Sequence, residues 1–180
     1  MAGPNLPILD ERGRLTPEVK KCMELMAKYK ICVFTGHRSY PETLAMVQYC
    51  HEVGGHILLT HAGAMPWGAG ASGTVEQSKE LVKLGAYIEI ALHFFVGAAA
   101  IWPLSNPPGT TNWLKAMGPE RIVMSTDLGQ PTALHPIEGY RIAIRMLAHA
   151  GISKEDLKIM FQKNAIDALY LDQTAPSGVW

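Results

Sequence analysis

Apolar and polar positions follow two different periods along this chain, and the two periods alternate. Short apolar runs at residues 31–35, 56–60, 87–92 and 121–126 have the length of buried strands. The stretches between them place apolar residues three and four apart, which is the spacing of an amphipathic helix. Strands that alternate with helices predict right-handed β-α-β units and a parallel sheet. We therefore expect an α/β fold of four parallel β/α units.

Capping residues predict where several helices begin and end. Thr16 with Pro17, and Ser39 with Pro41, have the form of an N-cap followed by an early proline. The helices expected with defined bounds span residues 74–84, 112–117, 138–150 and 164–171. We expect one domain over residues 1–180, with a loose tail from 172 to 180.

Four parallel strands form either an open sheet or half of a closed (β/α)8 barrel, the TIM-barrel architecture. Four strands cannot close around a packed core by themselves, because about eight are needed to fill a barrel interior. The strands 31–35 and 121–126 would then expose apolar edges. We expect a second copy to cover them, giving a homodimer or higher homo-oligomer in which the halves close one barrel or pack face to face.

Composition narrows the range of partners and compartments. Lys plus Arg and Asp plus Glu each total 16, so the formal net charge is zero, and neither nucleic acid nor an anionic membrane is an expected partner. The apolar stretch 84–104 contains Glu89, His93 and Pro103, which argues against a membrane span. The start of the chain lacks the pattern of a signal peptide. Three cysteines without a C-x-x-C pair predict reduced, buried thiols in a cytoplasmic protein.

Three of the four expected strands end in the same way. Each runs apolar, reaches a threonine, and then presents a side chain that can bind a metal: His37, His61 and Asp127. Gly36 allows a sharp turn before His37, whereas no such turn is expected at His61. Since parallel strands deliver their carboxyl ends to one rim, these side chains should meet there as a metal site. The alternative for each residue alone is a cap on a helix or a contact with loop backbone.

Further candidates lie close to these three in the expected fold. Glu89 sits inside a strand that should be buried on both faces, so its carboxylate must pair with a cation or a neighbouring Lys or Arg. His93 ends that strand and His135 follows Asp127 by eight residues; either could be a ligand, a substrate contact or, across an interface, a replacement ligand. Residues 68–73 match G-x-G-x-x-G formally but do not directly follow a strand, so we expect a loop over the rim.

Several of these motifs together resemble the amidohydrolase superfamily. They are Thr-Gly-His at 35–37, Thr-His at 60–61, Ser-Thr-Asp-Leu-Gly-Gln at 125–130, Gly-Ile-Ser-Lys-Glu-Asp-Leu at 151–157, and Asn164 with the following alanine. The resemblance implies the second half of a TIM-type metal-dependent hydrolase, in which His37, His61 and Asp127 match the ligands of the fifth, sixth and eighth strands. The family's first-strand His-x-His pair has no counterpart here, and Asp10 and Glu11 are the nearest candidates for its fourth-strand ligand.

These observations predict a metal-dependent hydrolase acting on a small molecule. Zinc is the expected ion, with manganese or iron as alternatives, and it would activate a water toward an amide, ester, lactone or related bond. Asp127 would bind the ion or take the proton from the water, with Glu89 and His93 as further acid–base groups. One alternative is a non-catalytic barrel remnant that binds a small molecule or a partner protein. Another is an open flavodoxin-like sheet that binds a phosphorylated ligand at 68–73.

Overall fold

The four expected strands form one all-parallel sheet. In the computed structural model, which describes residues 7–61, 74–96, 107–131 and 133–174, the sheet order is β1-β2-β3-β4. Its strands are β1 (Val33–Phe34), β2 (Ile57–Leu59), β3 (Tyr87–Ala91) and β4 (Ile122–Ser125). The prediction of four parallel β/α units is confirmed, and the arrangement is that of half a (β/α)8 barrel.

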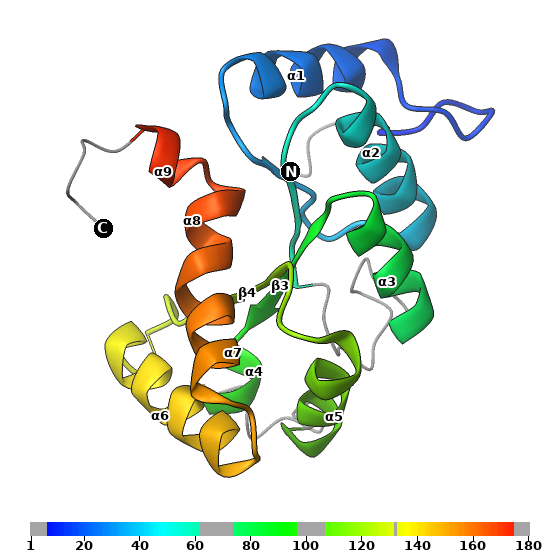
Figure 1. Cartoon of the computed structure of the whole chain (residues 1–180). Helices are drawn as coiled ribbons and strands as arrows, with labels where there is room; N and C mark the ends of the chain where they lie inside the picture. The colour runs from blue at the N-terminus through cyan, green and yellow to red at the C-terminus, as the bar shows by residue number, and fades with distance from the viewer. Residues whose placement is uncertain (1–6, 62–73, 97–106, 132, 175–180) are drawn as a thin grey trace.

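Helices separate the strands in the expected order (Figure 1). They are α1 (Pro17–Lys28), α2 (Tyr40–Glu52), α3 (Val75–Lys83), α4 (His93–Val96), α5 (Pro107–Met117), α6 (Pro136–His149), α7 (Lys154–Lys158), the π-helical turn η2 (Ile159–Lys163), α8 (Asn164–Ala168) and α9 (Leu171–Thr174). Helix α5 therefore begins five residues before the predicted start. Part of the tail predicted to be loose lies in α9, and residues 175–180 lie outside the described part of the chain.

The two faces of the sheet are covered unequally. Side chains such as Leu59, Ile88 and Ile122, all fully buried, face the main core beneath the helices. The opposite face carries a smaller cluster, in which α8 contributes Ala168. Figure 1 shows α2 and α3 to one side of the strands and the run from α7 to α8 to the other. Glu89 alternates with the core residues of β3 and so lies on the less covered face.

The outer edge of β4 is closed by side chains. The Ile122 carbonyl accepts a hydrogen bond from Asn164 Nδ2 at 2.7 Å, and the Met124 carbonyl accepts one from the Tyr140 hydroxyl at 3.2 Å. Ile122 and Met124 are buried as well, so the prediction of an exposed apolar edge at 121–126 is wrong. At the other edge Phe34 and Ile31 are exposed, at 51% and 52%.

The amino-terminal ends of the strands carry a set of interlocked aromatic and charged side chains, which we call the base cluster: Lys30, His56, Tyr87, Arg121, Asp167 and Tyr170. Its aromatic rings and charged groups are joined by a series of pairwise contacts. The His56 ring stacks on Tyr170 with centroids 3.9 Å apart, and the Arg121 guanidinium lies 4.4 Å from the Tyr87 ring centroid. Asp167 accepts a short hydrogen bond from the Tyr87 hydroxyl. The base cluster thereby ties α8 and its C-terminal end to β2, β3 and the start of β4.

The structure bears on the predictions about a membrane span and about the cysteines. No helix in the described ranges is long and apolar enough to cross a membrane. The three cysteines are free thiols; Cys32 and Cys50 are buried as predicted, whereas Cys22 is exposed, contrary to the prediction. Burial raises the pKa of Cys32 from 9.0 to about 12 and that of Cys50 to about 11, so both thiols stay protonated at neutral pH.

Candidate metal and catalytic site

Three strand ends turn at residues with left-handed backbone. Gly36, His61 and Asp127 have φ angles of 63°, 53° and 47°. Gly36 turns the chain as predicted, but the expectation of no such turn at His61 is wrong, because His61 itself takes this conformation. A side chain with a Cβ adopts it at some cost in free energy. The chain therefore leaves the sheet sharply at the carboxyl ends of β1, β2 and β4.

Threonines hold the first two of these ends together. Thr35 Oγ1 accepts a hydrogen bond from the Thr60 backbone N–H at 3.1 Å, and Thr60 Oγ1 accepts one from the Gly36 N–H at 3.2 Å. The two hydrogen bonds link the end of β1 to the end of β2. Thr60 directly precedes His61, and Thr35 is separated from His37 by Gly36 alone. The threonines of the repeated strand ending thus fix the relative positions of His37 and His61.

The three predicted ligands lie side by side at this rim. His37 Nε2 is 3.1 Å from His61 Nδ1, and the two rings meet edge to face. His61 Nε2 is 3.6 Å from Asp127 Oδ2. The His61 side chain is 17% exposed and the Asp127 side chain 36%, so the group is open to a small molecule. His61 occupies the middle of the set, with one ring nitrogen toward each neighbour.

Glu89 joins the same set from the middle of β3. Its Oε2 accepts a hydrogen bond from the His61 backbone N–H at 3.1 Å. Within the described part of the chain no lysine or arginine lies at ion-pair distance from Glu89, and the remaining residues include neither type. The predicted alternative of a structural salt bridge on a neighbouring strand is therefore not formed. We call His37, His61, Glu89 and Asp127 the rim site.

The other predicted residues have different places. His93 begins α4, and its backbone N–H donates to the Thr126 carbonyl at 2.9 Å, which puts it beside the end of β4. His135 is the N-cap of α6, where Nδ1 accepts a hydrogen bond from the Ile137 N–H. His135 thus caps a helix, a role that the sequence suggested for the strand-end residues and not for His135. Residues 68–73 lie outside the described ranges.

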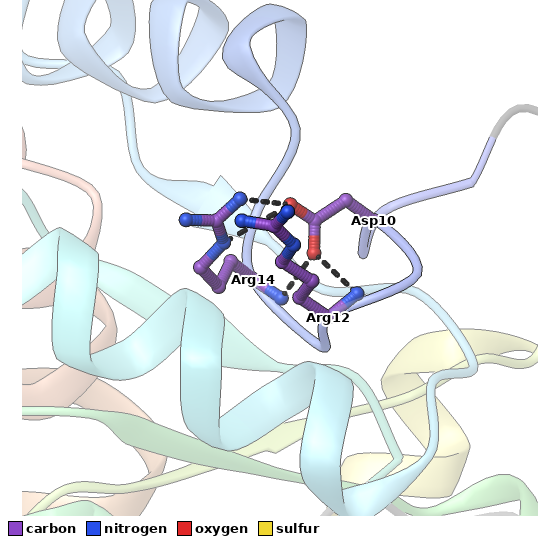
Figure 2. A network of polar contacts seen from close by, with 3 residues as sticks. All are labelled: Asp10, Arg12 and Arg14. Atoms are coloured by element: carbon purple, nitrogen blue, oxygen red, sulfur yellow. Dashed lines mark hydrogen bonds and ion pairs between the residues drawn. The ribbon is translucent and has the colours of Figure 1, made fainter.

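Asp10, considered as a fourth-strand ligand, organises a turn near the N-terminus. Figure 2 shows its carboxylate turned toward Arg14 and the backbone of Arg12. Hydrogen bonding from the Arg14 backbone, then from its side chain and from Arg12, holds the pKa of Asp10 below its usual value. Its oxygens are thus engaged by the turn, 2.9 Å from Arg14 Nη2 and 2.9 Å from the Arg12 N–H.

The rim site matches a metal ion in donor chemistry, and in part in geometry. Two nitrogens on a tetrahedral zinc ion stand about 3.3 Å apart for bonds of about 2.0–2.1 Å; His37 Nε2 and His61 Nδ1 are separated by 3.1 Å. Asp127 faces the other nitrogen of His61, so as they lie one ion cannot touch all three side chains. Accordingly, no group of three or more His, Cys, Asp or Glu side chains in the described ranges is arranged to hold an ion. The histidines fit as a ligand pair, with Asp127 behind His61.

Sequence reasoning missed three polar groups near this rim. Tyr140 lies close enough to Glu89 that the carboxylate, after burial itself, raises the pKa of the phenol. Ser125 Oγ and Arg38 Nε are buried and have no hydrogen-bond partner within the described residues. Ser125 and Arg38 could have been noticed, since one lies two residues before Asp127 and the other directly follows His37. Tyr140 gave no such signal, because it belongs to a helix far along the chain.

Comparison with known proteins yields one partial match. The profile of a family described as "Family of unknown function (DUF6282)" matches residues 2–89. This segment contains His37, His61 and Glu89 and ends before Asp127. No curated protein and no solved structure matches the chain.

Proposed function

We propose that this chain is a metal-dependent hydrolase that acts on a small molecule at the rim site. The observation that carries the proposal is the spacing of 3.1 Å between His37 Nε2 and His61 Nδ1, with both carboxylates next to His61. Two imidazoles facing each other with nearby carboxylates form a donor set suited to zinc, and also to manganese or iron. The resemblance to amidohydrolases supports the same chemistry.

Each rim residue has a distinct task in this proposal. His37 and His61 hold the ion, which when bound lowers the pKa of a water ligand to about 7. Asp127 orients the His61 ring through Nε2 and accepts a proton as substrate is attacked. Glu89 fixes the His61 backbone by accepting its N–H. His93, beside the end of β4, is a second candidate for proton transfer.

The bond cleaved is an amide, ester, lactone or related bond, all of which suit an activated water. A panel of p-nitrophenyl esters, γ-lactones, amino-acid anilides and p-nitrophenyl phosphate tests the proposal. We expect turnover of at least one class, loss of that turnover with a chelator, and recovery with Zn²⁺ or Mn²⁺. Turnover that survives chelation would exclude the metal-dependent reaction.

A second candidate is a remnant that binds a small molecule or partner protein without catalysis. Its supporting observation is the absence of a His-x-His pair, together with a described rim that offers a ligand pair rather than a ligand trio. Such a protein should show no turnover in the panel, and chelation should leave its stability unchanged.

We further propose that the protein works in the cytoplasm as a homodimer or higher homo-oligomer. The exposed Ile31 and Phe34 at the β1 edge support self-association there, whereas β4 is closed by Tyr140 and Asn164. Light scattering should give at least twice the chain mass of 19.7 kDa. Phe34→Asp should then yield monomers; a parent protein that is monomeric at micromolar concentration contradicts the proposal.

A further inference from the structure

Arg38 follows His37 directly and is half-buried at the same rim. Its Nε is buried and has no hydrogen-bond partner within the described residues. No carboxylate there lies at ion-pair distance from its guanidinium, and the residues outside the described ranges include no Asp or Glu. A cation that is partly removed from water without a counter-charge costs free energy, so such groups are normally paired.

The other arginines show how unusual this is. Arg14, Arg121 and Arg141 each pair with a carboxylate, at 2.9, 3.8 and 2.5 Å. Arg12 and Arg145 have no such pair but are exposed to solvent. Arg38 therefore combines partial burial with the lack of a carboxylate partner.

The nearest acid in sequence is engaged elsewhere. Glu42, in the first turn of α2, uses its Oε2 to accept hydrogen bonds from the Ser39 backbone N–H at 3.0 Å and the Ser39 hydroxyl at 2.7 Å. These bonds, with a smaller contribution from the Arg38 charge, lower the pKa of Glu42. Glu42 thus caps the helix through Oε2, and within the described ranges it forms no ion pair with Arg38.

We propose that Arg38 binds a negatively charged group, a carboxylate or a phosphate, of the small molecule that the rim site handles. A guanidinium presents a planar fork that grips either group through two parallel hydrogen bonds. Arg38 belongs, with His37, to the short segment that joins the carboxyl end of β1 to α2, so its guanidinium is carried by the same end of the sheet as the rim site. That this anion is part of the substrate rests on the proposed function. Binding of the anion by Arg38 does not require that the protein hydrolyses anything.

Calorimetric titration with inorganic phosphate and with succinate, at constant ionic strength set by sodium chloride, tests it. We expect saturable binding of at least one anion by the parent, weakened about tenfold or more in Arg38→Gln, since a charge-assisted pair is lost. Arg145→Gln, which removes an exposed arginine, should bind as the parent does. Phosphate binding alone would identify a phosphorylated substrate, and succinate binding alone a carboxylate.

Two outcomes would overturn the inference: no saturable binding of either anion by the parent, or equal binding by parent and Arg38→Gln. A structural role is tested separately by urea unfolding without anions. Arg38→Gln and Arg38→Met should unfold at the same or higher urea concentration than the parent, and a clear loss of stability in both would show that the fold needs the guanidinium. Failure of the proposed function is distinguishable, because His37→Ala should lose metal yet retain anion binding, whereas Arg38→Gln should retain metal.

Discussion

The rim site and the base cluster lie at opposite ends of the same four strands and pair their side chains differently. In the base cluster cations meet rings and a carboxylate: Arg121 contacts the Tyr87 ring and is 3.8 Å from Asp167. At the rim, two imidazoles face each other, with His37 exposed and the Asp127 side chain 36% exposed. In parallel α/β proteins, residues at the carboxyl ends of strands carry the chemistry and those at the amino ends carry stability.

The rim site and the base cluster do not differ in backbone strain. Lys30, Arg121 and Tyr170 in the base cluster have φ angles of 55°, 65° and 56°, close to those of His61 and Asp127 at the rim. Left-handed residues are thus a way of turning the chain at either end of this sheet. What separates the ends is the set of partners that each side chain finds.

The largest effect should come from Asp127→Asn, which keeps the volume but removes charge and basicity. Hydrolysis should fall by about 10²–10⁴-fold, the usual loss for a general base. Circular dichroism and urea unfolding should remain near those of the parent. Asp167→Asn, the matched change in the base cluster, should leave turnover within twofold. Parental turnover in Asp127→Asn would exclude a catalytic role for this carboxylate.

Tyr87→Phe should destabilise the base cluster, at the amino-terminal ends of the strands. Tyr87 is fully buried and its hydroxyl donates to the exposed Asp167 carboxylate, so the variant should lose about 0.5–1.5 kcal/mol of unfolding free energy, the usual net contribution of one hydrogen bond. Urea unfolding measures the loss, and turnover should be unchanged. The control is Tyr29→Phe, since Tyr29 is 63% exposed. Equal stability of Tyr87→Phe and the parent would contradict the structural role of the base cluster.

Alkaline pH should destabilise the fold at the less covered face of the sheet, where Cys32 and Tyr87 are buried, as well as in the main core at Cys50. Burial raises the pKa of Cys32 from 9.0 to about 12, and of the Tyr87 phenol as well, so the folded state favours their neutral forms. Stability from these groups is complete below pH 9 and declines as the pH rises toward 12. Urea unfolding between pH 8 and 11 should show this decline, and it should be shallower in Cys32→Ala. A flat profile in the parent would count against it.

The smallest effect is a difference in thiol labelling. A disulfide reagent at pH 8 should react quickly with Cys22, which is exposed, and slowly with the buried Cys32 and Cys50. In urea all the thiols should react. Rapid labelling of Cys32 in the native protein would mean that the small buried cluster around Cys32 and Tyr87 is accessible to the reagent in solution.

The sequence predicted the parallel sheet and the gathering of His37, His61 and Asp127, because hydrophobic period and strand direction are local properties. It did not predict that His61 would lie between the other two with a nitrogen toward each, since ring orientation depends on contacts across strands. Nor did it predict the base cluster, which joins Tyr87 to Asp167 across 80 positions of chain. The closing of the β4 edge by Tyr140 and Asn164 depends on the same kind of distant packing.

Metal content is the most direct test of the central claim that His37 and His61 hold an ion. The parent, His37→Ala, His61→Ala and the control His149→Ala, which changes an exposed histidine in the last turn of α6, are purified from zinc-supplemented medium and subjected to elemental analysis. We expect about one ion per chain in the parent and in His149→Ala, as for a mononuclear site, and near-complete loss in the two rim variants. A parent without metal, or rim variants that keep as much as the parent, would contradict the account.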